Sequence, residues 1–278
     1  MMTVSAGTRT ELPAEPAAVE SAARAGWHGS RAGLIWTLVR TDFKVRYHGT
    51  VGGFVWALLK PLAMFVMLMG VFSFLFASEP NYKLNLIIGL FLWDFFASGT
   101  VAGMGSLQSR GFLLTKARCP AWILIVCSIS NALITYAFFS IIILVFLALI
   151  GHTPSVAAAL LFLVYGVTMA AVIAGFSLAA SVLFLRYRDL NQIWDMALQA
   201  GFFVAPIIYP IGILPERFHI YLYLWAPTPL IQFTRSVLVD GRIPTLTAHI
   251  YLTVAVALCL IVGTLIYRRF GPRAAEYL

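Results

Sequence analysis

Six long apolar stretches constrain the fold of this chain more than any other feature. Each is close to or above the ~20 residues that a helix needs to cross a bilayer. The sequence therefore predicts an all-α polytopic membrane protein with six transmembrane helices. The stretches are Val51–Phe76, Leu84–Leu107, Pro120–Ile150, Val156–Leu185, Ile193–Ile211 and Ile250–Tyr267.

The composition supports the same fold class. Of the 278 residues, 61% are hydrophobic and 11% are charged, and the mean hydropathy is +0.90; these values fit a polytopic membrane protein better than a soluble domain. We expect residues 1–33 to form a disordered cytoplasmic tail without a cleavable signal, because they contain no apolar core. Residues 34–47 are expected to form an amphipathic interface helix, and residues 48–278 the transmembrane domain, with no room for an appended soluble domain.

Lysine and arginine are distributed unequally between the two sets of span ends. One set has twelve of these cations near it and the other has four, which predicts a multi-pass protein of the cytoplasmic (inner) membrane with both termini cytoplasmic. Of the 19 cations, Arg9 and Arg24 lie too far from a span to count, and Lys60 lies inside one. The net charge of +8 thus reflects orientation in the membrane and does not require nucleic acid as a partner. The twelve are Arg31, Arg40, Lys44, Arg46, Arg110, Lys116, Arg118, Arg186, Arg188, Arg268, Arg269 and Arg273; the four are Lys83, Arg217, Arg235 and Arg242.

Several catalytic signatures are missing from the chain. It contains no Gly-Lys dipeptide, so we expect no phosphate-binding loop and no ATPase activity. It also lacks a Gly-x-Ser-x-Gly elbow and a His-Glu-x-x-His helix. The five histidines are scattered, as are the three cysteines, and neither set indicates a metal site or a disulfide framework. Asp94 and Asp195 are the carboxylates within the spans, few for an ion-driven carrier. The chain is thus expected to be no enzyme and to hold no cofactor, and any energy for transport must come from a partner.

The segment from Leu34 to Tyr47 has the pattern of a helix lying along the membrane surface. Trp36, Val39, Phe43 and Tyr47 form one apolar stripe, and the stripe is flanked by cations. A juxtamembrane helix held by anionic lipid explains the same pattern. The flanking cations are Arg40 and Lys44.

This segment resembles the entry segment of ABC-2 type permeases that export polysaccharides. The resemblance rests on Arg-Thr-Asp-Phe-Lys-Val-Arg-Tyr at 40–47, followed at the family's spacing by Thr50, Gly53, Trp56 and Pro61. Three positions depart from the family's pattern. Thr50 stands where serine is usual, Gly52 where leucine is usual, and Lys60 where a polar, uncharged residue is usual.

Three later segments are similar to the same family, in the same order along the chain. Lys116–Pro120 resembles its cytoplasmic segment before the third span, and Phe184–Asp189 its second cytoplasmic turn. Ala205–Pro210, with Pro227 and Pro229 beyond, resembles the signature that precedes its external re-entrant helices. The resemblance covers the chain from about residue 34 to its end.

The resemblance implies a homodimer that works with two copies of a separate ABC ATPase, in which ATP and Mg are bound. The cargo would be a lipid-linked glycan of O-antigen, teichoic acid or galactan type, as used in lipopolysaccharide or cell-wall biosynthesis. It also implies three cytoplasmic elements that dock the ATPase, although their cations equally serve as ordinary topology determinants. The implied docking residues are Arg40, Lys44, Arg46, Arg110, Lys116, Arg118, Arg186, Arg188 and Asp189.

Lys60 and Asp94 are opposite charges on consecutive predicted spans. Each lies about ten residues into its span, which at 1.5 Å per residue places both near the middle of a ~30 Å hydrocarbon core. An ion pair between them is one interpretation, because an unpaired charge at that depth costs at least ~2.5 kcal/mol. The other is that one or both face the transport pathway.

Between the fifth and sixth spans the chain offers two apolar pieces, Phe218–Trp225 and Leu230–Leu238. Each is too short to cross a bilayer. We expect a re-entrant helical pair that caps the outer end of the pathway, which is tolerable only if buried in protein or lining a water-filled cavity. An ordinary external loop is the alternative. Arg235 would be a snorkelling anchor or a ligand for an anionic headgroup. The predicted external gate comprises Pro206, Tyr209, Pro210, Pro227, Pro229 and Arg235.

Three other functions fit parts of the sequence. A drug or small-lipid exporter of the ABC-2 type would share the architecture and differ only in cargo. A membrane-embedded glycosyltransferase would need a cluster of Asp and Glu near a loop, which the sequence lacks. A channel would need no ATPase.

Overall fold

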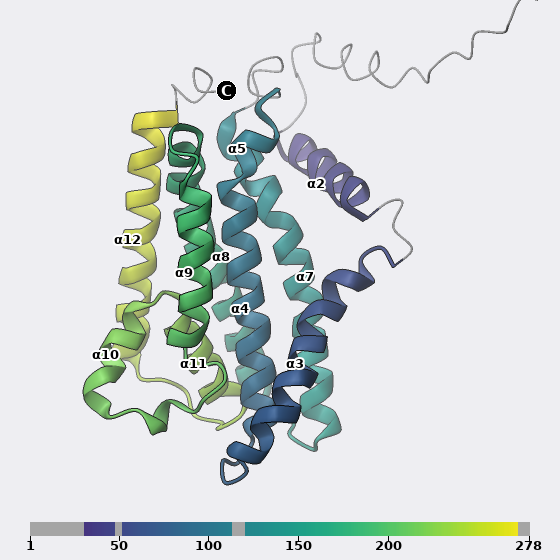
Figure 1. The fold of residues 1–278 in the computed structure, drawn as a ribbon, viewed down its shortest axis with the longest axis vertical. Coiled ribbons are helices and arrows are strands. Elements are labelled where there is room, and N and C mark those ends of the chain that lie inside the picture. Colours follow the sequence, from purple (N-terminus) through teal and green to yellow (C-terminus); the bar gives the residue numbers. More distant parts are fainter. Residues whose placement is uncertain (1–30, 48–51, 113–119, 272–278) are drawn as a thin grey trace, which may run out of the picture.

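A computed structural model describes residues 31–47, 52–112 and 120–271. These residues form helices joined by short turns, arranged as a bundle of long helices with a shorter helix beside one end and a cap at the other (Figure 1). The helices are α2 (Arg31–Tyr47), α3 (Val55–Leu75), α4 (Tyr82–Met104), α5 (Ser106–Ser109), α7 (Ala121–Leu149), α8 (Val156–Arg186), α9 (Leu190–Val204), the 3₁₀ turn η1 (Ile211–Ile213), α10 (Glu216–Leu224), α11 (Pro227–Leu238) and α12 (Leu246–Phe270).

Five of the described helices are long and apolar enough to cross a membrane: α3, α4, α7, α8 and α12, with 21 to 31 residues each. The fifth predicted span, Ile193–Ile211, is not one continuous helix. Its helical part, α9, has 15 residues and so extends ~22 Å, less than the ~30 Å core of a bilayer. The prediction of six full-length helical spans is therefore not confirmed.

A proline explains why α9 ends early. Ala205 follows its last residue with φ −66° and ψ 130°, an extended conformation. The residue before a proline is driven out of the helical region by a clash with the proline ring, and Pro206 follows Ala205 directly. Pro206 also lacks the N–H that would continue the helical hydrogen bonds.

Helix α4 lies at the centre of the bundle and is the most buried of the long helices, with α3, α7, α8 and α11 packed against it. Stacked aromatic pairs fill its interface with α7: Phe91 and Phe139 have ring centroids 4.2 Å apart, and Phe95 and Tyr136 4.5 Å apart. By contrast, α3 and α12 leave most of their apolar side chains exposed. Mean hydropathy alone does not reveal this difference, because all of these helices are strongly apolar.

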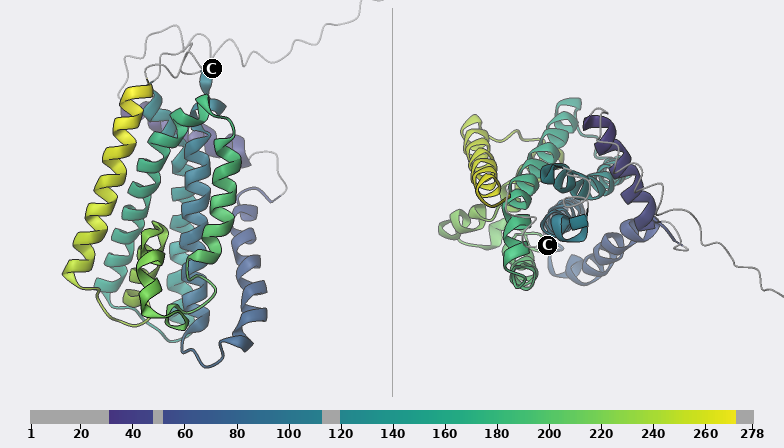
Figure 2. Two further views of the ribbon diagram at one scale, coloured as in Figure 1. Left: turned by 60° about the vertical axis from the view of Figure 1, so that its left-hand side comes forward. Right: turned by 90° about the horizontal axis from the view of Figure 1, so that it is seen from above.

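The predicted cytoplasmic and external segments gather at opposite ends of the bundle (Figures 1 and 2). Helix α5, the end of α12, the α8–α9 turn and α2 lie at one end, whereas the α3–α4 turn, the α7–α8 turn and the cap lie at the other. Helix α2 is oblique to the long helices and packs against α7. It begins at Arg31, three residues before the predicted boundary at Leu34. The rest of the predicted 1–33 tail lies outside the described residues.

Candidate functional site: an external cap and a cytoplasmic face

The cap consists of the non-helical segment 205–210, η1, α10 and α11. Helices α10 and α11 form where the two apolar pieces were predicted, with 9 and 12 residues. They differ in burial. Helix α11 packs between α4 and α8 and buries Leu230 and Ile231 completely, whereas in α10 the buried residue is Leu222. The described structure thus places one of the two helices inside the bundle and the other on its margin, and the re-entrant pair stays a prediction.

The gate residues Pro227 and Pro229 lie between the two predicted apolar pieces in the sequence. Pro227 and Pro229 lie in the first turn of α11 and not in a loop between the helices. Prolines are tolerated there because the first N–H groups of a helix have no partner within it. The break between α10 and α11 lies before these prolines, at Trp225, which has an extended backbone (φ −76°, ψ 114°).

Arg235 on α11 ties the cap to the bundle. Its side chain is 6% exposed. Its Nε donates to the carbonyl of Asn85 at 2.9 Å, and its Nη1 and Nη2 donate to the carbonyls of Pro206 and Ile207 at 2.6 and 3.0 Å. The next carbonyl, that of Ile208, accepts from the Tyr82 hydroxyl at 2.8 Å.

These contacts correct both expectations for Arg235. The side chain neither snorkels to the surface nor presents itself to a headgroup, because its donors are directed at backbone carbonyls. The cause is the early end of α9: carbonyls in the non-helical segment 205–208 have no helical partner, and a buried carbonyl without a partner costs ~1–3 kcal/mol. A planar guanidinium donates at once to a carbonyl of α4 and to the carbonyls of segment 206–207. The ammonium group of a lysine lacks this fork of donors.

Gly89 of α4 makes room for this arginine. A Cβ atom at position 89 would lie 2.5 Å from Arg235 Nη2. Sequence analysis missed Gly89, Asn85 and Tyr82. The available signal was the glycine itself, since a glycine within an apolar helix weakens the helix and so suggests a close approach by another group.

An aromatic cluster joins the α10–α11 reversal to α4 and α9. The ring of Trp225 lies 6.0 Å from Phe96, 6.2 Å from Trp194 and 6.4 Å from Trp93, centroid to centroid. Trp194 is fixed by a hydrogen bond from its Nε1 to Thr100 Oγ1 at 3.1 Å. Because Trp194 belongs to α9, the cap contacts the same helix that begins at the opposite, predicted cytoplasmic end.

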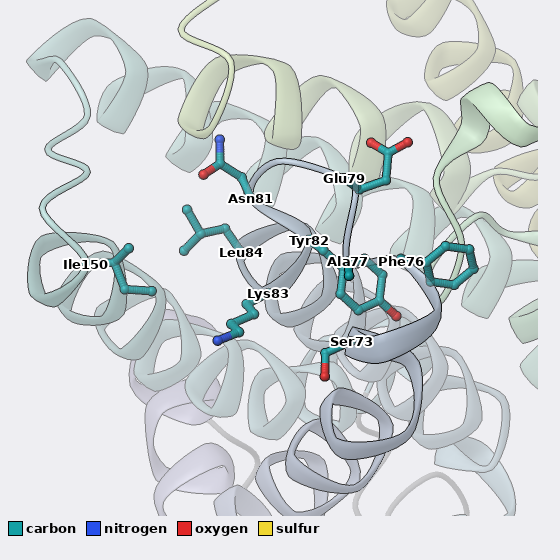
Figure 3. A pocket seen from close by; sticks show the side chains of 9 residues that line it. All are labelled: Ser73, Phe76, Ala77, Glu79, Asn81, Tyr82, Lys83, Leu84 and Ile150. Atoms are coloured by element: carbon teal, nitrogen blue, oxygen red, sulfur yellow. The ribbon is translucent and has the colours of Figure 1, made fainter.

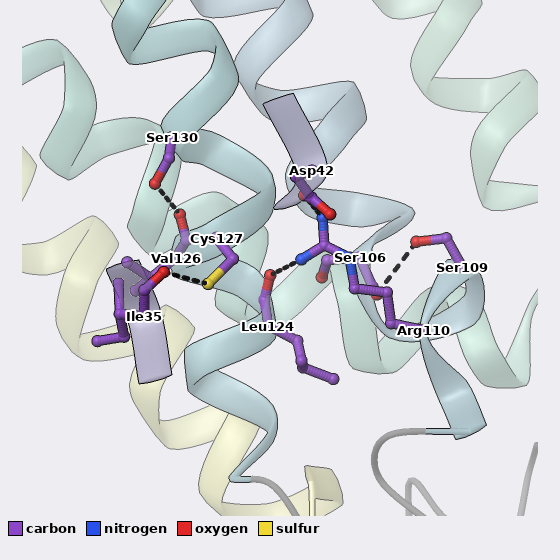
Figure 4. Close-up of polar contacts among 9 residues, drawn as sticks. All are labelled: Ile35, Asp42, Ser106, Ser109, Arg110, Leu124, Val126, Cys127 and Ser130. Carbon is purple, nitrogen blue, oxygen red and sulfur yellow. Dashed lines mark hydrogen bonds and ion pairs between the residues drawn. The ribbon is translucent and has the colours of Figure 1, made fainter. Parts of the chain in front are cut away.

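At that opposite end, Arg110 links three helices (Figure 4). It follows α5, forms an ion pair with Asp42 of α2, and donates from Nη1 to the carbonyl of Leu124 in α7 at 3.3 Å. The two side chains are 16% and 24% exposed, and burial lowers the pKa of the Arg110 guanidinium. A weak bond from Cys127 Sγ to the carbonyl of Ile35 adds a second α2–α7 contact. Arg110, predicted to dock an ATPase, is thus engaged within the chain, and sequence analysis did not identify its partner Asp42.

The other predicted docking residues are either exposed or outside the described part of the chain. Arg186, Arg188 and Asp189 are all exposed on the α8–α9 turn, where Arg186 lies over the ring of Tyr187 at 5.3 Å from its centroid. Arg40 and Lys44 are exposed on α2. Lys116, Arg118 and the side chain of Arg46 lie outside the described residues.

Lys60 and Asp94 lie on the adjacent helices α3 and α4. Lys60 is exposed and Asp94 half-buried. The two are near enough for their charges to interact, but within the described residues their side chains form no ion pair of 4.0 Å or less. The ion pair, one of the two interpretations, is therefore not formed by these two described side chains, and the alternative that either residue faces a pathway stays a prediction.

Two hollows of about 260 Å³ each open near the α3–α4 turn. In the first, the carboxylate of Glu79 and the amine of Lys83 lie on opposite sides, so the polar groups do not converge (Figure 3). The second lies between this turn, the 207–212 segment and α11, and Arg235 forms part of its wall. No group of three or more His, Cys, Asp or Glu side chains that could hold a metal ion occurs within the described part of the chain.

Comparisons with known proteins agree with this architecture. A family model described as ABC-2 type transporter matches residues 33–238. An O-antigen export system permease protein RfbA of Klebsiella pneumoniae is 26% identical over 254 residues, covering 88% of this chain and 95% of that protein. A protein of the same description from Myxococcus xanthus is 25% identical over 216 residues, covering 76% of this chain and 82% of the relative. With its apolar helices, matched motifs and family match, the chain belongs to the ABC-2 type transporter family and is a transporter membrane subunit.

Proposed function

We propose that this chain is the permease subunit of an ATP-driven exporter that moves a lipid-linked polysaccharide outward across the cytoplasmic membrane. Two copies of the chain would form the pathway, and two copies of a separate ABC ATPase would drive it. The observation that carries the proposal is the similarity to O-antigen export permeases over nearly their whole length. Similarity of that extent covers both ends of the bundle.

The structure supports a division of labour between those ends. The exposed Arg186–Asp189 turn offers a mixed-charge surface to a cytoplasmic partner, and α9 continues directly from it to the cap. Trp194 and Trp225 connect α9 with the α10–α11 reversal. A displacement of the turn by an ATPase would therefore be transmitted along one short helix to the outer end. The exposed apolar faces of α3 and α12 provide surface for lipid and for the second copy.

Deletion of the gene in its own host tests the cargo. We expect surface polysaccharide to be lost while the lipid-linked glycan accumulates on the cytoplasmic side, and expression of the wild-type chain to restore both. A catalytically inactive ATPase partner should reproduce the deletion. Normal surface polysaccharide in the deletion strain, with another lipid or a small molecule retained inside, would assign the chain to a different export function.

A further inference from the structure

The second hollow, between the α3–α4 turn and α11, is built from two helical faces. Gln232, Arg235 and Ser236 are spaced i, i+3 and i+4, so they share one face of α11. Tyr82 and Asn85 are spaced i, i+3 on the first turn of α4. Because the Arg235 and Tyr82 hydrogen bonds hold both faces against the 206–208 carbonyls, the hollow is part of a fixed framework.

Two amide side chains in its wall have unmet hydrogen-bonding capacity. Asn85 Oδ1 and Gln232 Nε2 are buried and have no hydrogen-bond partner. One is an acceptor and the other a donor. Buried polar groups are nearly always paired, so an unpaired acceptor and donor beside one hollow indicate a ligand that offers both kinds of group.

The charges of the other side chains in the wall narrow the chemical class of the ligand. Glu79 and Asp240 contribute two carboxylates, which accept hydrogen bonds, against the single positive charge of Arg235. This excess of negative charge disfavours an anionic ligand. A metal cation is disfavoured as well, because the positive charge of Arg235 and the amide donor of Gln232 lie in the same wall. Tyr82 and Tyr209 add aromatic side chains to the wall. The hydroxyl groups of a sugar both donate and accept hydrogen bonds, which matches the unpaired atoms of Asn85 and Gln232.

We propose that this hollow binds a neutral sugar unit, with Glu79, Asn85 and Gln232 holding its hydroxyl groups. A volume of about 260 Å³ is near the lower end of the ~300–1,000 Å³ of small-molecule pockets and suits one or two rings. The inference rests on the proposed function, since the hollow lies at the capped end where an exported glycan emerges. The proposed site gives the exported glycan a specific contact at the capped end of the bundle.

Binding is tested on the full chain in nanodiscs with methyl glycosides of neutral hexoses at millimolar concentration, using saturation-transfer NMR. At least one glycoside should receive saturation. Glu79→Gln and Gln232→Leu should each weaken its binding about tenfold, the effect of one lost hydrogen bond. Glu216→Gln removes an exposed carboxylate from α10, outside the hollow, and should leave binding unchanged. Glu79 is itself exposed, so its variant is expected to fold even where Gln232→Leu does not.

Three results would overturn the site: no saturation of any glycoside, equal binding in all variants, or stabilisation of the chain by calcium without glycoside binding. The export assay distinguishes this failure from failure of the proposed function. Glycan export by a chain that binds no glycoside would remove the hollow and leave the function standing. Glycoside binding by a chain that exports no glycan would retain the site and refute the function.

Discussion

Arg235 shows how one residue can hold a non-helical segment inside an apolar protein. Its hydrogen bonds reach carbonyls 28, 29 and 150 residues away in sequence. The geometry depends on the fork of the guanidinium and on the open space at Gly89. Both residues are therefore expected to matter more for stability than their positions in the sequence suggest.

Replacing the arginine should destabilise the chain. Arg235→Met leaves the buried carbonyls of Pro206 and Ile207 without these donors, each worth ~1–3 kcal/mol. We expect a clear drop in the thermal midpoint of the detergent-solubilised protein, and no rescue by Arg235→Lys because one ammonium cannot match the fork. Arg217→Met, an exposed arginine on α10, is the matched control. Equal midpoints for the 235 and 217 variants would show that the carbonyls find other partners.

Adding a single methyl group at Gly89 tests the close approach of Arg235. Gly89→Ala places a Cβ 2.5 Å from Arg235 Nη2, which forces the guanidinium to move. Overpacking of this kind typically costs ~1–3 kcal/mol. Gly70→Ala on α3 is the control, since nothing lies within 4 Å of its added Cβ. The same thermal assay should show a lower midpoint for the first variant and an unchanged or raised one for the second; a reversed order would contradict the close approach.

At the scale of elements, the predicted cytoplasmic face is organised by pairings between helices. Helix α2 is attached through Asp42 and Ile35, and α9 through its aromatic contacts with α4 and the cap. The described docking residues are exposed, with the exception of Arg110. Mutations can therefore test the contacts that hold α2 in the bundle separately from the contacts predicted with the ATPase.

The α2 attachment predicts a charge-specific stability loss. Arg110→Met removes the ion pair and a carbonyl contact, and hydrogen bonds to charged groups contribute ~1.5–3 kcal/mol. Asp42→Asn should lose less, because an amide oxygen still accepts from arginine. Arg40→Met, exposed on the same helix, serves as the control in thermal unfolding. Identical midpoints for the 110 and 40 variants would mean that the pair contributes nothing measurable.

The α8–α9 turn predicts a different phenotype. Arg188→Glu reverses an exposed charge and should leave the thermal midpoint unchanged while weakening co-purification of the ATPase or uncoupling its activity from transport. Arg242→Glu, exposed at the opposite end of the bundle, should affect neither. If the ATPase remains associated and export continues in the Arg188 variant, the turn serves only orientation in the membrane.

At the scale of the whole molecule, the arrangement separates the predicted cytoplasmic and external segments. Five helices long and apolar enough to span a membrane, together with the shorter α9, place successive turns at alternating ends. The twelve-to-four distribution of cations predicts which end is cytoplasmic. The absolute orientation is open to a labelling experiment.

Single cysteines at the two ends of α8 test the orientation. In a chain without its three native cysteines, Thr153→Cys should react with an impermeant thiol reagent in whole cells. Tyr187→Cys should react only after the membrane is opened; both positions are exposed in the structure. The opposite labelling pattern would invert the topology, and equal labelling of both would show that α8 does not span.

The apolar lengths and the asymmetry of the cations by themselves determined the fold class, the order of the helices and the grouping of their ends. The length of an apolar stretch and the charges beside it do not depend on which residues pack together, so the sequence alone reveals them. The resemblance in four short motifs, confirmed by the family match, supplied the transporter class.

Tertiary structure alone decided what the buried charges do. The sequence predicts a snorkelling anchor or a headgroup ligand at Arg235 and a docking residue at Arg110, whereas in the structure both are engaged by groups of the chain itself. Hydropathy identifies a charge in an apolar segment but not the group opposite it. That group is set by where helices end and how they pack: Pro206 stops α9 and exposes the carbonyls that Arg235 binds, and the packing of α2 against α7 brings Asp42 to Arg110.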